Sequence, residues 1–188
     1  MNKPKVVIFN SPKLSGKDFM CFQLRDILEH KSFKYELYKD VAKYYGVEVG
    51  TFIRLNDNRN TKEVPHFWLQ GLSPREALIH VSEDIIKPKH RRDYYGVKLA
   101  ESLFEGGVYG VSDGGFQEEF NAVVDSIGVE NVLLIRMFTQ TSTFEGDSRS
   151  YIEDDRGCSV YDHFNAKTEK DVFIIRNVVE NWLVGYWE

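Results

Sequence analysis

The residues best suited to chemistry lie near the start of the chain, in a polar loop between an apolar run and a helical pattern. Residues 6–9 read Val-Val-Ile-Phe, and residues 11–18 read Ser-Pro-Lys-Leu-Ser-Gly-Lys-Asp. A glycine and a lysine at the start of a helix suit an anion, because backbone N–H groups and the helix dipole favour negative charge there. The sequence therefore predicts a phosphate-binding loop over residues 11–18.

This loop departs from the Walker pattern, in which a glycine and four further residues precede Gly-Lys-Ser/Thr. Its first position is Ser11, and its last is Asp18, a carboxylate where a hydroxyl usually contacts Mg²⁺. Pro12 has no N–H to offer an anion. The alternative interpretation is a strand-to-helix turn that happens to contain Ser-Gly-Lys. If the loop binds ATP, its contacts are Ser11, Lys13, Leu14, Ser15, Gly16, Lys17, Asp18 and Phe19.

Lys17 is the candidate catalytic residue of this loop. Its ammonium would reach the β- and γ-phosphates and offset the charge that develops during phosphoryl transfer.

A second candidate, Asp113, follows the apolar run of residues 107–112 and precedes Gly114 and Gly115. A carboxylate at the end of a central strand is placed like the second Walker acid, which binds Mg²⁺ directly or through water. The alternative is an ordinary Asp-Gly turn. The two candidate metal ligands are therefore Asp18 and Asp113, and the expected ion is Mg²⁺.

Arg75 lies in the first turn of a helix that the segment Ser73-Pro74-Arg75-Glu76 predicts. Ser73 fits the N-cap, and Glu76 completes a capping box. An arginine at such a position can hold a phosphate bidentately. A solvated arginine whose stem lies along the surface is the alternative.

Residues 139–157 form a polar, aperiodic segment that contains Arg149 and Arg156. A segment of this kind can close over a phosphoryl-transfer site, exclude water and deliver arginines. It can equally be a surface loop whose arginines pair with neighbouring aspartates, and the sequence leaves both interpretations open.

The apolar runs alternate with helical patterns, which indicates an α/β fold with a parallel sheet and helices on both faces. We expect a three-layer α/β/α arrangement with a mostly parallel, five-stranded sheet. The chain is expected to be one domain, with a core of residues 1–39, 106–138 and 158–188, a helical insertion near 40–105 and the lid at 139–157. Strands are predicted at 5–9, 33–38, 107–112, 132–135 and 172–175, and a C-terminal helix from Asn177.

The bulk properties exclude some classes of function. A formal net charge of −5 argues against a general nucleic-acid or membrane-surface binder, so the basic stretch 87–92 is interpreted as a solvated turn. No apolar stretch is long enough for a membrane span, and the start of the chain lacks a signal sequence. The two cysteines have no metal-type spacing. These features predict a reduced protein of the cytoplasm.

Four segments, in order along the chain, resemble the phage-type deoxynucleoside monophosphate kinases. Ser15-Gly16-Lys17-Asp18 is similar to the loop ending of that family, and 58–63 to its Asp-Arg-x-x-Lys-Glu segment. Residues 73–76 resemble its Ser-Pro-Arg-Glu helix start, and 112–119 its Ser-Asp-x-Arg-Phe-x-x-Glu strand end. The chain has Gly115 where the family often has arginine.

The resemblance implies a P-loop kinase fold and transfer of the ATP γ-phosphoryl to a deoxynucleoside monophosphate, with Mg²⁺, giving ADP and the diphosphate. The expected partners are ATP and the monophosphate, and neither nucleic acid nor a membrane is expected. The expected location is the cytoplasm, which is that of the host if the protein is viral. Exposed aromatic residues would permit a homodimer. The insertion would bind the monophosphate. The implied catalytic residues are Lys17, Arg75 and Arg149; the implied acceptor-binding residues are Lys13, Arg59, Arg75 and Asp113; the implied lid residues are Arg149 and Arg156.

Other functions stay open. A small-metabolite kinase on the same fold would share the loop but not the monophosphate site. A non-catalytic nucleotide-binding protein is favoured by Ser11, Pro12 and Phe19, which all depart from common loop residues. A nucleic-acid-binding role ranks last.

Overall fold

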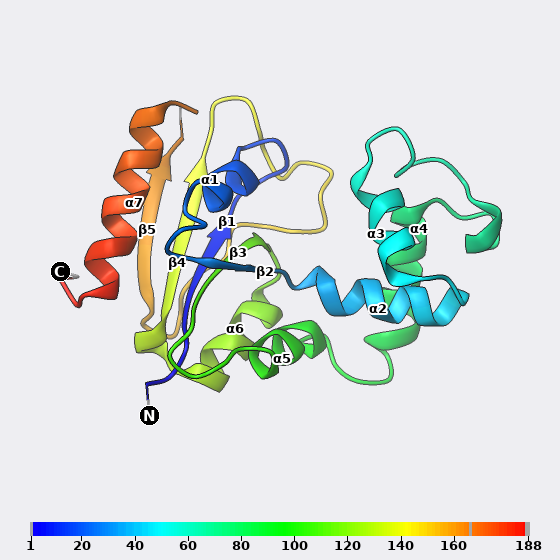
Figure 1. Ribbon diagram of the computed structural model, residues 1–188, viewed down its shortest axis with the longest axis horizontal. Helices are drawn as coiled ribbons and strands as arrows, with labels where there is room; N and C mark the ends of the chain where they lie inside the picture. The colour runs from blue at the N-terminus through cyan, green and yellow to red at the C-terminus, as the bar shows by residue number, and fades with distance from the viewer. Residues whose placement is uncertain (1, 166, 187–188) are drawn as a thin grey trace.

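The computed structural model describes residues 2–165 and 167–186, which form an α/β fold around a five-stranded, all-parallel sheet (Figure 1). The strand order is β2-β3-β1-β4-β5. The predicted α/β class and five-stranded sheet are thus confirmed. The strands are β1 (Lys5–Asn10), β2 (Glu29–Lys31), β3 (Val108–Gly114), β4 (Val132–Phe138) and β5 (Ser159–Phe164).

Helices cover both faces of this sheet. The α-helices are α1 (Lys17–Gln23), α2 (Lys34–Tyr45), α3 (Val49–Asp57), α4 (Pro74–Ile79), α5 (Tyr94–Glu101), α6 (Gln117–Ile127) and α7 (Glu169–Leu183). A π-helix, His80–Ile86, continues from α4, and short 3-10 turns lie at Phe67–Leu69 and Val129–Asn131.

The central strand β1 shows why the layers form. All of its side chains from Val6 to Phe9 are fully buried, and successive side chains point to opposite faces. Val6 and Ile8 pack in a cluster with residues of α5 and α6, whereas Val7 and Phe9 pack with residues of α1 and α7. The run of β-branched residues therefore fills two cores at once and holds the loop after β1 at the carboxyl edge of the sheet.

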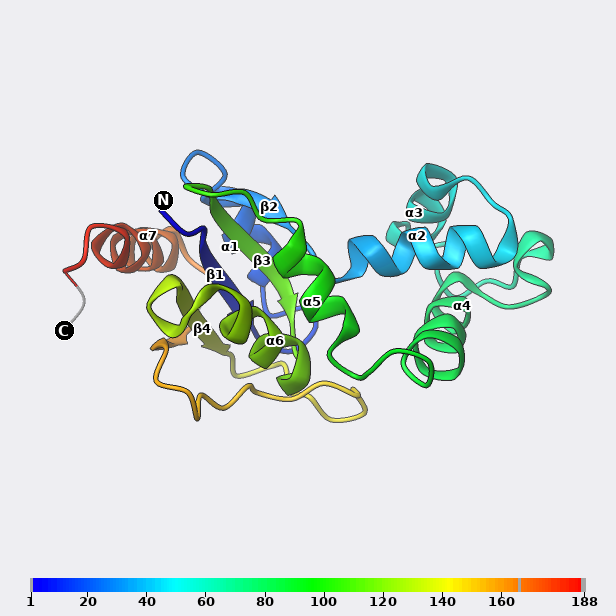
Figure 2. The ribbon, with the colours of Figure 1, turned by 90° about the horizontal axis from the view of Figure 1, so that it is seen from below.

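The helices α2, α3 and α4 lie beside the sheet as a separate helical unit (Figure 2). Their own apolar cluster joins Val41, Phe52, Leu69, Ala77 and Val81. The capping box predicted at α4 is present: the Ser73 hydroxyl accepts from the Glu76 N–H, and the Glu76 carboxylate accepts from the Ser73 N–H.

Two strand predictions are wrong, and both concern the edges of the sheet. Residues 33–38 enter helix α2, and the edge strand is the preceding polar segment, β2. Residues 172–175 lie inside α7, which begins at Glu169 instead of Asn177, and the other edge strand is β5. Edge strands contact neighbours on one side only and tolerate polar residues, so their sequences lack the apolar run that marks a central strand.

Within the described ranges, no helix combines the length and the apolar character that crossing a membrane requires.

Candidate phosphate-binding site

The loop between β1 and α1 bends sharply where the helix begins. Gly16 has φ +94°, in the left-handed region that favours glycine. A Cβ added at this position would also lie 3.2 Å from the amide nitrogen of Asn165. The Gly16 carbonyl accepts from the Met20 N–H at 2.9 Å and so starts the helix. The positive φ therefore favours glycine at this point of the loop, and any side chain here would press against the Asn165 amide.

Hydrogen bonds within the loop and from the β5–α7 connection fix the conformation of the loop. The buried hydroxyls of Ser11 and Ser15 bond to each other. The side-chain amide of Asn165, from the β5–α7 connection, donates to the Ser15 carbonyl at 2.7 Å. Lys17 donates from Nζ to the Pro12 carbonyl at 3.3 Å, so its side chain reaches back across the loop. The loop thus surrounds a lysine ammonium.

Lys17 is a buried cation, with only 6% of its surface exposed. Burial is the largest influence on its pKa and lowers it; the Asp18 carboxylate opposes this, and the positive charges of Arg149 and Lys34 lower the pKa further. An ammonium has three donors, and a single protein acceptor for them is found among the described residues. The remaining donors suit an anion.

Arg149 is the one of the two predicted lid arginines that lies beside this loop. Its charge acts on Lys17, and Asp113 and Asp18 in turn act on its guanidinium. Arg156 lies elsewhere, paired with Asp125 of α6. The residue after Arg149, Ser150, accepts a hydrogen bond from Asn10 directly before the loop, and the Arg149 charge lowers the pKa of Lys17, whereas Arg156 pairs with α6.

Asp113 has a structural partner that the sequence does not reveal. Its carboxylate accepts from the Ser32 hydroxyl at 2.7 Å and from the N–H groups of Phe33 and Lys34, each at 3.1 Å. These bonds cap the first turn of α2 and join the end of β3 to the helical unit.

Of the two candidate metal ligands, Asp18 is exposed, whereas the Asp113 carboxylate already accepts three hydrogen bonds. Asp18 is exposed at the start of α1 and lines the cleft described below. Magnesium commonly uses one or two carboxylates together with substrate phosphates and water, so a single free carboxylate suffices. Among residues 2–165 and 167–186, no cluster of three or more His, Cys, Asp or Glu forms a metal cage.

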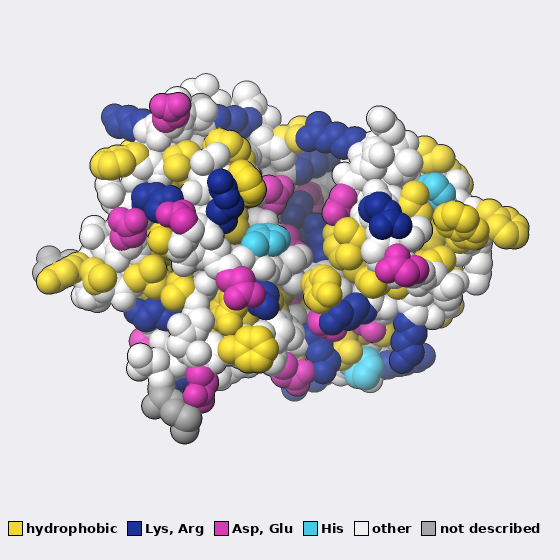
Figure 3. Space-filling model, viewed as in Figure 1, with side chains coloured by type: hydrophobic (Ala, Val, Ile, Leu, Met, Phe, Trp, Pro, Cys, Tyr) yellow, Lys and Arg dark blue, Asp and Glu magenta, His cyan; other side chains and the backbone are white. Residues whose placement is uncertain are grey.

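A cleft of about 1120 Å³ opens between the sheet edge and the helical unit. Figure 3 shows this hollow with lysine or arginine side chains inside it. Its lining includes two of the predicted site residues, Arg59 and Asp113, in addition to Asp18. It also includes side chains that sequence reasoning missed: Lys34, Tyr38, Asn56, Asp57 and Lys62.

Arg75 lies at the edge of this region. Its Nε donates to a Glu63 carboxylate oxygen at 2.6 Å, and its side chain is half exposed. Its positive charge lowers the pKa of Lys62, after the larger effects of burial and of Lys34. Lys34 and Lys62 therefore line the cleft, and Arg75 of α4 lies next to Lys62, whose carbonyl accepts from the Arg75 N–H at 3.2 Å.

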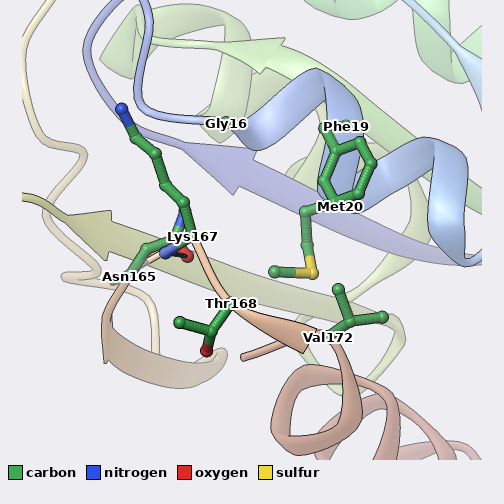
Figure 4. A pocket seen from close by; sticks show the side chains of 7 residues that line it. All are labelled: Gly16, Phe19, Met20, Asn165, Lys167, Thr168 and Val172. Carbon is green, nitrogen blue, oxygen red and sulfur yellow. Dashed lines mark hydrogen bonds between the residues drawn. The ribbon is translucent and has the colours of Figure 1, made fainter. Parts of the chain in front are cut away.

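A smaller pocket of about 160 Å³ lies on the other side of the loop, between α1 and the β5–α7 connection (Figure 4). Phe19 lines it together with the apolar side chains of Met20 and Val172. Three residues of the β5–α7 connection also line this pocket and were not predicted, because a strand was expected at 172–175 and no turn before a helix. They are Asn165, Lys167 and Thr168.

Comparison with known proteins adds no assignment: no protein-family model matches the chain, and no curated protein matches it either. The candidate site therefore depends on its geometry and on the sequence motifs.

Proposed function

We propose that this protein is a P-loop type kinase that transfers the γ-phosphoryl of ATP to a deoxynucleoside 5′-monophosphate. The observation that carries the proposal is the buried Lys17 ammonium, enclosed by a glycine-containing loop at a helix start, with the Arg149 guanidinium nearby. The motif resemblance over four segments supports the same function.

The donor nucleotide would bind across the loop. Its β- and γ-phosphates would face Lys17 and the N–H groups at the start of α1. The small pocket lined by Phe19, Met20 and Val172 offers an apolar surface next to the loop for the base. Mg²⁺, when bound, would neutralise charge on the β- and γ-phosphates, held by those oxygens and by Asp18.

The acceptor monophosphate would bind in the large cleft, where Lys34, Lys62 and Arg59 supply positive charge. An oxygen of the acceptor phosphate attacks the γ-phosphorus and forms a new P–O bond. The bond from the γ-phosphorus to the β–γ bridging oxygen breaks, and its electron pair leaves on ADP. The protein's own residues position these groups and stabilise charge on the transferring phosphoryl.

One observation favours a second candidate, a nucleotide-binding protein without transfer activity. Pro12 offers the anion no N–H, and its carbonyl accepts one of the Lys17 donors. Such a loop would bind phosphates with fewer backbone contacts than a standard one. ATP binding without formation of ADP in the presence of any acceptor would favour this candidate.

A thermal-shift panel tests the proposed substrates. The protein is heated with each deoxynucleoside and ribonucleoside monophosphate, with and without a non-hydrolysable ATP analogue and Mg²⁺. A ligand that binds only the folded state raises the unfolding temperature. We expect the analogue and at least one deoxynucleoside monophosphate to raise it, and a panel without any shift would contradict the proposal.

A further inference from the structure

We infer that Asp147 and Gly115 are positioning residues that hold the Arg149 guanidinium at the phosphate loop. This inference rests on the proposed function, because it gives Arg149 the role of contacting the transferring phosphoryl group.

Asp147 fixes the direction of the guanidinium. Its carboxylate accepts from Arg149 Nε at 3.0 Å and from Nη2 at 2.7 Å, and its Oδ1 also accepts from the Arg149 backbone N–H at 3.1 Å. Both side chains are only 14% exposed. A bidentate, charge-assisted pair with little exposure restricts the arginine far more than a pair on the open surface.

Gly115 leaves the space in which the arginine stem lies. A Cβ at this position would come within 2.6 Å of Arg149 Cδ and 2.9 Å of its Cβ and Cγ. The Ser150 N–H donates to the Gly115 carbonyl at 3.2 Å, which keeps the two backbones adjacent. The absence of a side chain at 115 is therefore what allows the side chain of 149 to pass.

The backbone around Arg149 is also tied to the sheet. The fully buried Asn10, the last residue of β1, donates to the carbonyls of Gly114 and Ser150 at 3.2 and 3.0 Å. Its Oδ1 accepts from the Ile152 N–H at 2.9 Å. The middle of the segment 139–157 is thus bonded to the strand that leads into the phosphate loop.

The held guanidinium keeps a free donor. Nη1 of Arg149 has no protein partner in the described part of the chain, while Nε and Nη2 are bonded to Asp147. Its charge acts on Lys17 across the loop. A donor oriented before the reaction stabilises charge at the phosphoryl group without the cost of reorganisation.

A double-mutant cycle tests the inference. Asp147→Asn, Asp147→Glu and Gly115→Ala are made in the wild-type protein and in Arg149→Ala, with Asp125→Asn as the control that breaks the surface pair of Arg156. We expect Asp147→Asn and Gly115→Ala to lower kcat about 10- to 100-fold with a small change in the KM for ATP, by analogy with residues that orient a ligating group. Asp147→Glu should retain part of the activity, and the control should retain all of it.

The decisive result is the effect in the Arg149→Ala background. A positioning residue acts through the arginine, so Asp147→Asn and Gly115→Ala should lower kcat no further once the arginine is gone. Full, additive losses in that background, or wild-type kcat in both single variants, would overturn the inference and leave the proposed function standing.

The same cycle is run on binding of Mg·ADP with aluminium fluoride, a mimic of the transferring phosphoryl group. If the wild type transfers no phosphoryl to any monophosphate, the proposed function fails, and non-additive losses of mimic affinity would still support the arginine geometry. A wild type that neither transfers nor binds the mimic contradicts both.

Discussion

The loop of residues 11–18 and the large cleft beside the helical unit differ in how their charged groups are held. In the loop, Lys17 is buried, and Arg149 is fixed by a carboxylate. Arg59, which lines the cleft, is exposed, and Arg75, which lies outside that lining, is half exposed in a surface pair with Glu63. On the proposed function, the cations of the loop are positioned before ATP binds, whereas the exposed Arg59 and Arg75 would have to turn toward an acceptor phosphate, beside the partly buried Lys34 and Lys62. Substitutions in the loop should lower kcat, and substitutions around the cleft should raise KM.

The largest expected effect follows from removing the buried ammonium. Lys17→Ala should lower kcat about 10²- to 10⁴-fold, as loss of a preorganised charge contact does. Steady-state rates of ADP formation at saturating ATP measure this change. Lys89→Ala, which removes an exposed lysine of the basic turn, is the matched control and should retain wild-type rates. Equal rates in the Lys17 and Lys89 variants would show that the buried ammonium of the loop contributes no more to catalysis than an exposed lysine does.

Glu119 of α6 is a buried carboxyl, with 5% of its surface exposed. Burial, and then the charge of Asp113, raises the pKa of its carboxyl to about 8. As the pH rises from about 4.5 to 8, the unfolded chain releases this proton first, so the folded state loses stability over that window. Glu119→Gln removes this loss.

Denaturant unfolding at pH 5 and pH 8 measures this loss of stability in the wild type and in Glu119→Gln. The wild type should lose about 3–4 kcal/mol more than the Gln variant between these two pH values, because one proton contributes at most about 1.4 kcal/mol for each pH unit. Parallel losses would show that the carboxyl is hydrated in the folded protein.

Arg75 tests the open side of the comparison. Arg75→Ala should raise the KM for the monophosphate about 10-fold, equivalent to about 1.4 kcal/mol, with a smaller change in kcat. Initial rates over a range of acceptor concentrations separate the two constants. Arg54→Ala, an exposed arginine on α3, is the control. A loss confined to kcat would place Arg75 with the preformed groups of the loop instead.

The smallest effect is expected at Arg156. Its guanidinium pairs with Asp125 on the surface of α6, and such exposed pairs contribute little. Arg156→Ala should leave kcat and both KM values unchanged in the same assay. A marked loss of kcat would show that the segment 139–157 rearranges to bring this arginine to the loop.

The sequence predicted the parts of the site that depend on local order. The run Val6–Phe9, the turn at Gly16 and the capping box at Ser73 follow from neighbouring residues, and the structure confirms these local features. The family resemblance gives the catalytic role to Arg149 and not to Arg156, but the contacts that separate the two arginines could not be predicted, because they depend on Asp147, Asp125 and the space at Gly115.

Contacts between distant segments were also missed. Asp113 caps a helix about 80 residues away in the chain, and Asn165 bonds a loop 150 residues away, so no local pattern marks either one. Lys34 was hidden by the incorrect strand at 33–38.

On the proposed function, the loop around Lys17 presents ATP to a monophosphate acceptor. The most direct measurement follows the γ-³²P label from Mg·ATP into product with each deoxynucleoside monophosphate, using the wild type and Lys17→Ala. We expect a labelled deoxynucleoside diphosphate with at least one acceptor, at a rate that falls about 10²- to 10⁴-fold in the variant. No labelled diphosphate with any acceptor, or the same rate from Lys17→Ala, would contradict it.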